Sequence, residues 1–146
     1  MLKNSKQSEK SLHPWDLPSS PWQRIHIDFA GPFLDQTLLI MVDTHSEWPE
    51  VIPMKKIKKS TTIEILRTVF ARNGIPEQIV SDDGPQFTSR EFAKFTKLNG
   101  IKHFRSAPYH QATNGLAERF VQTLNRSMKL MKNEDMSLNK KIATFL

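Results

Sequence analysis

Apolar residues recur along the first part of the chain with the period of β-strands. Residues 24–30 alternate, with Ile25, Ile27 and Phe29 on one side and Asp28 on the other, as in a strand with one buried face. Residues 38–42 are apolar throughout, which is typical of a central strand covered on both faces. After a turn, residues 50–53 predict a third strand. We therefore expect an antiparallel meander in which Asp28 points away from the core.

Helical and extended patterns alternate in the rest of the chain. Residues 61–64 have the spacing of a capping box, and apolar residues follow at helical intervals until Gly74 and Pro76. Residues 78–81 predict a short strand, and a second capping box at residues 88–91 predicts another helix. Helices and strands should therefore alternate after the meander.

The last part of this pattern predicts one more strand and one more helix. Residues 101–104 predict a fifth strand, residues 106–115 a polar loop, and residues 116 to about 132 a longer helix. The inward stripe of that helix comprises Phe120, Leu124, Met128 and Met131. Three strands in a meander, followed by helix, strand, helix, strand and helix, predict an α/β domain with a mixed five-stranded sheet and flanking helices.

Composition narrows the class of protein. The 146 residues suit one domain, and we expect a flexible lead-in at residues 1–20 and the folded domain at 21–146. The absence of cysteine excludes disulfides, a thiolate nucleophile and a zinc knuckle within this segment. Residues 38–42, the longest apolar run, are too few to cross a bilayer. We expect a soluble, intracellular protein without membrane contact, and its net charge of +6 favours a polyanionic partner.

Three acidic residues stand in distinctive local contexts. Asp28 lies in the first strand, Asp82 opens the segment 82–88 (DDGPQFT), and 35 residues separate Asp82 from Glu118. Phosphoryl transfer is well served by two divalent ions, and Mg²⁺ takes only a few carboxylate ligands from a protein. Asp28, Asp82 and Glu118 would be enough to hold two Mg²⁺ or Mn²⁺ ions, with Asp28 bridging both.

Each of these acids also has a purely structural interpretation. Asp28 could be a charge at a sheet edge, Asp82 could build an Asx-type turn before Gly84, and Glu118 could favour a helix N-terminus electrostatically. Taken singly, these interpretations are the commoner ones. Taken together, and with their flanking residues, the three acids favour a catalytic site.

With these flanks, the chain resembles the catalytic core of retroviral-type integrases, most of all those of gypsy-class long-terminal-repeat retrotransposons. The similarity extends from about His13 to about Leu146 and rests on four separate motifs. It implies the ribonuclease-H-like fold and assigns Asp28, Asp82 and Glu118 as catalytic residues and metal ligands. It also implies two reactions: water trims the 3′ ends of element DNA, and the freed 3′-hydroxyls attack target DNA.

The resemblance further implies a DNA-binding surface. Residues 109–115 resemble the mobile loop before the catalytic helix, where Tyr109 and Asn114 would contact a frayed DNA end. On the last helix, Gln122, Asn125 and Lys129 continue the line of Glu118, and we expect them to contact phosphates. Arg126 is a further cation of that helix. An ordinary surface loop and a solvated helix face are the alternatives.

Several positions depart from the family pattern. Asp83 stands where the family usually has Asn, Glu47 where it more often has Lys or Arg, and Gln111 where Pro is commoner. We expect Asp83 to lie behind the ligand Asp82, and Asp43 to shape a turn. The histidines lack the spacing of a metal set, so we expect them at the surface or behind the site: His26, His45, His103 and His110.

The leading hypothesis is therefore an integrase core that acts on element ends and target DNA in the nucleus and self-associates through the core. A host-captured, catalytically silent DNA- or protein-binding module is the main alternative. It is motivated by these departures and by the expectation that the C-terminal helix is cut short near Leu146. A nuclease that cuts RNA–DNA hybrids is a third option with the same fold and metals.

Overall fold

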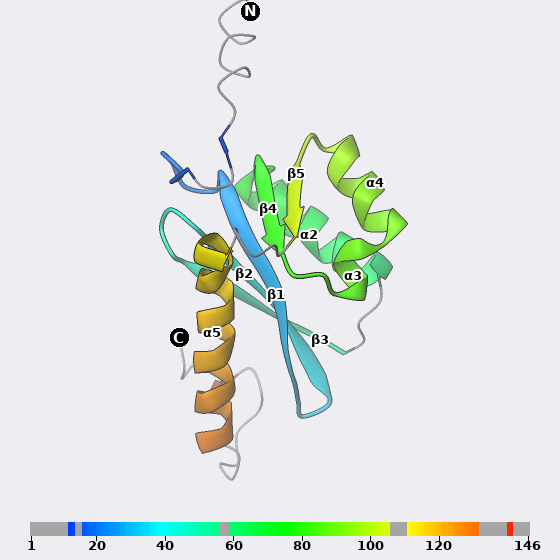
Figure 1. Ribbon diagram of the computed structural model, residues 1–146. Coiled ribbons are helices and arrows are strands. Elements are labelled where there is room, and N and C mark those ends of the chain that lie inside the picture. The colour runs from blue at the N-terminus through cyan, green and yellow to red at the C-terminus, as the bar shows by residue number, and fades with distance from the viewer. Residues whose placement is uncertain (1–11, 14–15, 56–58, 106–110, 132–139, 142–146) are drawn as a thin grey trace, which may run out of the picture.

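The fold places a mixed sheet between helices on both faces (Figure 1). The computed structural model describes residues 12–13, 16–55, 59–105, 111–131 and 140–141, with only the backbone of residues 59–60 and 111–118. The elements in chain order are β1 (Arg24–Phe33), β2 (Gln36–Asp43), β3 (Pro49–Met54), α2 (Lys59–Asn73), β4 (Gln78–Ser81), α3 (Pro85–Thr88), α4 (Arg90–Leu98), β5 (Lys102–Arg105) and α5 (Gln111–Leu130).

The sheet has the order β3-β2-β1-β4-β5 and confirms the predicted mixed, five-stranded architecture. β1 pairs antiparallel with β2, and β2 pairs antiparallel with β3. On its other side β1 pairs in parallel with β4, which pairs in parallel with β5. β1 is longer than predicted, because an irregularity in the register between Ala30 and Phe33 lets pairing with β2 continue past Gly31 and Pro32.

Two apolar clusters hold the layers together. The larger one lies between the sheet and helices α2, α3 and α4, and it includes Ile25, Ile27, Leu66 and Phe92. The smaller one lies beneath α5, where Leu124 and Met128 pack against residues of β1 and β2. Burial of apolar surface on both faces supplies the main driving force for this arrangement. The predicted inward stripe of α5 is thereby confirmed.

The prediction of a single buried face for β1 is wrong. Arg24 and His26 lie on the face opposite Ile25 and Ile27, yet each is only 1% exposed. The reason is that α5 packs on this face and that the lead-in contacts the guanidinium of Arg24, neither of which the alternation within β1 could reveal. Asp28 lies on the same face as His26, since its cross-strand partner Ile40 belongs to the cluster beneath α5. Of the two places expected for His26, at the surface or behind the site, its burial excludes the surface.

Some boundaries differ from the prediction for local reasons. A one-turn helix, α3, precedes α4, so Thr88 ends α3 and cannot be the N-cap of α4. Ser89 is that N-cap, and its side chain accepts a hydrogen bond from the backbone of Phe92 at 3.1 Å. β5 begins and ends one residue later than predicted.

The N-terminal part of α5 is the larger difference. The helix begins at Gln111, whereas the sequence predicted a loop up to residue 115. Gly115 therefore lies inside the helix, where a glycine costs only about 1 kcal/mol relative to alanine. A cost of this size does not stop a helix of 20 residues that packs along the sheet.

Contacts join part of the lead-in to the sheet. The buried guanidinium of Arg24 donates to the carbonyls of Asp16 (2.6 Å) and His13 (2.5 Å), and to Oε1 of Gln78 (2.8 Å). The side-chain nitrogen of Gln78 donates in turn to the carbonyl of Leu12. These contacts attach residues 12, 13 and 16 to the folded domain. The predicted domain boundary at residue 21 stays a prediction.

Candidate active site

Asp28 lies in the middle of the central strand β1. Its side chain is half-buried, and its Oδ1 accepts a hydrogen bond from the backbone of Phe29 at 2.8 Å. Alternation along the strand sends Phe29 to the opposite face, where it stacks on Phe87 with a ring separation of 5.2 Å. The carboxylate of Asp28 is thus fixed on the face of the sheet that α5 covers.

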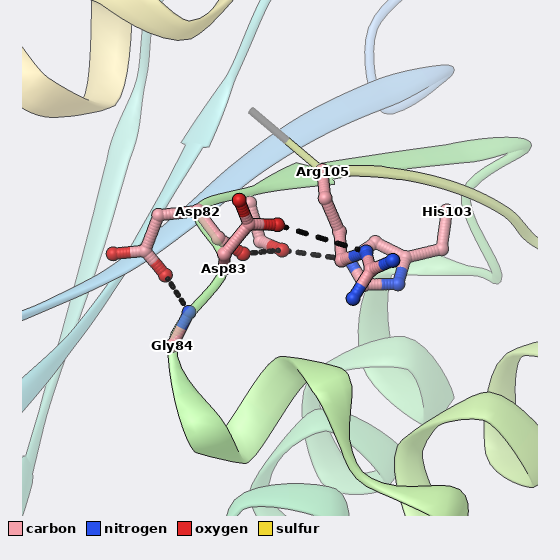
Figure 2. Close-up of polar contacts among 6 residues, drawn as sticks. Asp82, Asp83, Gly84, His103 and Arg105 are labelled. Atoms are coloured by element: carbon pink, nitrogen blue, oxygen red, sulfur yellow. Dashed lines mark hydrogen bonds and ion pairs between the residues drawn. The ribbon is translucent and has the colours of Figure 1, made fainter. Parts of the chain in front are cut away.

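Asp82 follows the last residue of β4, and its carboxylate builds a turn. Oδ1 accepts a hydrogen bond from the backbone nitrogen of Gly84 at 2.9 Å, which is the geometry of an Asx turn (Figure 2). A Cβ at position 84 would lie 2.9 Å from that same oxygen, so any larger residue there would displace the carboxylate. Because the turn uses one carboxylate oxygen, the other can bind a ligand.

The structure brings Asp28 and Asp82 to one pocket. Both line a cavity of about 360 Å³, and the other described residues of its wall are Phe29, Gly84, Pro85 and Gln86. The parallel pairing of β1 with β4 explains this proximity, since it sets Asp82 just beyond the end of a strand adjacent to Asp28. Two oxygen-donating carboxylates suit Mg²⁺ or Mn²⁺, which are hard cations, better than they suit metals that prefer sulfur or imidazole.

Asp83 points away from this pocket. Its carboxylate faces β5, where Oδ1 lies 3.7 Å from Nε of Arg105, while the carboxylate of Asp82 points in the other direction (Figure 2). Asp83 is not among the described residues that line the pocket. Both members of the ion pair are more than half exposed, so solvent screens their attraction.

Glu118 belongs to α5, the helix that contacts β1, β2 and β4. The structure describes only its backbone. Among the described side chains, no group of three acidic, histidine or cysteine residues forms a metal cluster. α5 packs on the face of the sheet that carries Asp28, and Glu118 belongs to this helix.

The predicted DNA-binding residues fall into two groups. On α5, the side chains of Gln122, Arg126 and Lys129 are exposed, and Asn125 is half-buried. Asn114 lies in the first turns of α5 with only its backbone described, and Tyr109 lies outside the described residues. Because α5 begins at Gln111, Asn114 is a helical residue and not part of a loop.

Ser81 and His103 form a contact that sequence reasoning missed. Oγ of Ser81 lies 2.6 Å from Nε2 of His103 and donates to the carbonyl of Asp82 at 2.9 Å. Burial, with a smaller contribution from the nearby charge of Arg105, lowers the pKa of His103 from 6.5 to about 4. The ring is therefore neutral near pH 7. The sequence predicted the two short strands that carry these residues, but not the register in which β4 and β5 pair.

Asp43 has a structural role, as expected. Its carboxylate, which is almost fully buried, accepts hydrogen bonds from the backbone of Trp22 (2.9 Å), from the backbone of Ser46 (3.2 Å) and from the Ser46 hydroxyl (2.7 Å). Burial alone would raise the pKa of Asp43, but these bonds outweigh burial and hold it below its ordinary value. Asp43 thus fixes the turn after β2 as a charged group.

Known proteins resemble this chain over most of its length. The family described as integrase core domain matches residues 18–111. A Caenorhabditis elegans protein named uncharacterized protein K02A2.6 is 46% identical over 131 residues, which cover 90% of this chain and 10% of that protein. The Gag-Pol polyprotein of walleye dermal sarcoma virus is 33% identical over 127 residues, covering 85% and 7% respectively. The chain thus spans a tenth or less of the length of these relatives.

Solved structures agree with the fold. The HTLV-2 integrase catalytic core domain in complex with magnesium, in a dimeric form, matches 87% of this chain and 85% of its own with a TM-score of 0.67 and 25% identity. The simian T-cell lymphotropic virus intasome in complex with a PP2A regulatory subunit matches 89% of this chain and 49% of its own, with a TM-score of 0.73. At 24% identity, this second match supports the fold alone.

No helix in the described part of the chain is long and apolar enough to cross a membrane. The assignment to the gypsy class stays a prediction, whereas the resemblance to retroviral-type integrases is confirmed. With its ribonuclease-H-like sheet and its match across most of its length, the chain belongs to the integrase core domain family.

Proposed function

We propose that this chain is the catalytic core of an integrase, which uses divalent metal ions to process DNA 3′ ends and to transfer the processed strands into target DNA. The observation that carries the proposal is the shared pocket of Asp28 and Asp82. Two carboxylates far apart in the sequence line it, and α5 with Glu118 covers the same face of the sheet. The magnesium complex of the HTLV-2 core supports a divalent metal for this chain too.

Asp28, Asp82 and Glu118 are the proposed ligands of two Mg²⁺ or Mn²⁺ ions. When bound, such ions would neutralise charge on the phosphoryl oxygens and activate the attacking hydroxyl or water. The chain itself contributes fixed carboxylates. Asp28 is held by the central strand, and Asp82 is held by its bond to Gly84. Phe29, Gly84, Pro85 and Gln86 complete the described wall of the pocket around them.

The exposed polar side chains of α5 are the proposed path of the DNA backbone. Gln122, Arg126 and Lys129 are exposed along the helix that carries Glu118, and Asn125 lies between them. Tyr109 and Asn114 would contact the DNA end nearer the site. Phosphate contacts of this kind are independent of sequence and weaken as salt concentration rises.

The proposal extends to assembly and location. Dimeric and trimeric forms of the HTLV-2 core support self-association of this core, which light scattering of the purified protein would test. A single molar mass, equal to that of one chain at all concentrations, would contradict it. DNA integration further implies that the protein works in the nucleus. Imaging of the tagged full-length protein would test this, and its absence from the nucleus would contradict it.

A strand-transfer assay on a branched DNA that mimics an integration product would test the function. We expect Mg²⁺- or Mn²⁺-dependent joining that is lost in Asp28→Asn, Asp82→Asn and Glu118→Gln. Glu64→Gln is the matched control, because Glu64 is an exposed acid of α2, on the opposite face of the sheet. Retained joining in any of the three variants would contradict the assignment of that acid. A folded, inactive protein that binds DNA equally well in EDTA would instead support the captured binding module.

A further inference from the structure

The backbone at Asp82 lies beyond the hydrogen-bonded ladders of the sheet. β4 has four residues, and its pairing with β1 ends at Val80. Its pairing with β5 ends one residue later, where Ser81 is opposite Arg105. A carboxylate that binds a metal must hold its position closely, because Mg²⁺ tolerates little departure from octahedral geometry. The bond from Gly84 holds the carboxylate of Asp82, and a second contact holds the peptide that follows it.

The hydroxyl of Ser81 supplies such a contact. It donates its one proton to the carbonyl oxygen of Asp82 at 2.9 Å. A hydroxyl has no second proton to give, so its 2.6 Å contact with Nε2 of His103 requires the imidazole to be the donor. The arrangement therefore requires a proton on Nε2, and in the neutral ring it selects the Nε2–H tautomer. The result is a chain of hydrogen bonds from the ring of His103 through Ser81 to the backbone of Asp82.

The ring of His103 is itself held firmly. It packs edge-to-face on Phe92, with ring centroids 4.9 Å apart and an interplanar angle of 67°. Phe92 is fully buried in the larger apolar cluster, so it cannot turn without disturbing the core. Ser81 is 3% exposed, and water has little access to replace the imidazole as its partner. β5, which carries His103, and α4, which carries Phe92, thus support the end of β4.

We propose that His103 is a positioning residue that acts through Ser81 to fix the peptide after Asp82, and so directs the carboxylate of Asp82 towards the pocket shared with Asp28. This inference rests on the proposed function, because it gives Asp82 the role of a metal ligand. His103 would touch neither the metal nor the DNA. Its contribution is to keep the main chain in one conformation where the ladders of the sheet end.

The first test needs no metal. Nitrogen-15 NMR of histidine-labelled protein reports which ring nitrogen carries the proton. We expect His103 as a neutral ring with Nε2–H near pH 7, and the Ser81→Ala variant should leave this ring exchanging between both tautomers. A stable Nδ1–H tautomer in the parent protein would overturn the proposal, whatever the metal affinity proves to be.

The second test compares a variant that keeps the donor with variants that lose it. His103→Gln presents an amide N–H at about the reach of Nε2, whereas His103→Leu and Ser81→Ala break the chain of hydrogen bonds. Binding of Mn²⁺, measured by the loss of the free-ion electron paramagnetic resonance signal, should weaken about tenfold in the two broken variants, the lower end of the effects typical of groups that orient metal ligands. His103→Gln should retain the parent affinity.

Thermal unfolding of the metal-free variants separates positioning from plain packing. If His103 only fills space, His103→Leu would lower Tm without changing the Mn²⁺ affinity of the folded protein, and the proposal would be overturned. Equal affinity in the Leu and Gln variants would overturn it as well. A parent protein whose Mn²⁺ binding is absent, or is unaffected by Asp82→Asn, would overturn the metal site of the proposed function and this inference with it. The NMR result shows separately whether the hydrogen-bond chain exists.

Discussion

The buried Arg24 should be one of the most sensitive positions for stability. Its guanidinium is 1% exposed and donates three hydrogen bonds, to Oε1 of Gln78 and to the carbonyls of His13 and Asp16. Burial lowers its pKa from the ordinary value, an effect that the charge of Asp16 only partly offsets. The informative perturbation is Arg24→Met, which keeps an unbranched side chain and removes every donor.

The expected loss follows from what each partner can do afterwards. Gln78 is 1% exposed, so its Oε1 would stay buried without a donor, at a cost of about 1–3 kcal/mol. The carbonyl of His13, at an exposed residue, can turn to water instead, and its loss should cost less. Methionine also relieves the cost of burying a cation, which offsets part of the loss. We therefore expect Arg24→Met to lower the free energy of unfolding by about 2–4 kcal/mol.

Urea unfolding followed by tryptophan fluorescence would measure this loss, with Arg72→Met as the control. Arg72 is exposed on α2, and its replacement should change stability by less than about 0.5 kcal/mol. The double variant Arg24→Met/Gln78→Leu removes both the donor and the orphaned acceptor, so it should be more stable than the sum of the single losses predicts. An effect of Arg24→Met no larger than the control, or strictly additive losses, would refute the reasoning.

Two further predictions concern the edge strand β5. Asp83→Asn should change stability by less than about 1 kcal/mol, because its ion pair with Arg105 is exposed, and it should leave the Mn²⁺ affinity unchanged, because Asp83 faces away from the pocket. Calorimetry and Mn²⁺ titration would check both, and a tighter or weaker site would contradict the orientation of Asp83. The second prediction follows from the lowered pKa of His103, about 4 against 6.5. The unfolded chain takes up this proton first, so stability is lost as pH falls from about 6.5 towards 4. Urea unfolding at several pH values should show a shallower loss in His103→Gln, and parallel curves for the two proteins would refute it.

The elements could be predicted from the sequence where burial depends on local periodicity. β4 has the predicted bounds, and the inward stripe of α5 packs as expected, with Leu124 fully buried. The prediction from periodicity failed for β1, because alternation of apolar and polar residues separates the two faces of a strand but does not show which segments cover each face. Arg24 and His26 occupy positions typical of a solvated face. That face is covered by α5, from the far end of the chain, and the lead-in contacts the guanidinium of Arg24.

The acids of the candidate site could be predicted from the sequence, whereas the contact behind them could not. The family resemblance and the spacing of the acids led to Asp28 and Asp82, and the fold sets them around one pocket. The contact of Ser81 with His103 depends on how β5 aligns beside β4, where Ile79 is opposite His103 and Ser81 is opposite Arg105. A shift of one residue in that register would turn His103 to the other face of the sheet. Neither residue type nor spacing reveals such a register.

The segment from Asp82 to Gly84 also shows that the structural and the catalytic interpretations need not exclude each other. The Asx turn fixes one oxygen of Asp82 on the backbone of Gly84, which restricts the direction of the other oxygen. Restriction of this kind lowers the entropy that a carboxylate loses when it binds a cation. Arg105 of β5 meanwhile attracts Asp83, the acid that replaces the usual asparagine of the family, on the opposite side of the chain. The additional negative charge is thereby kept away from the pocket, so a second acid beside Asp82 does not by itself argue against an active site.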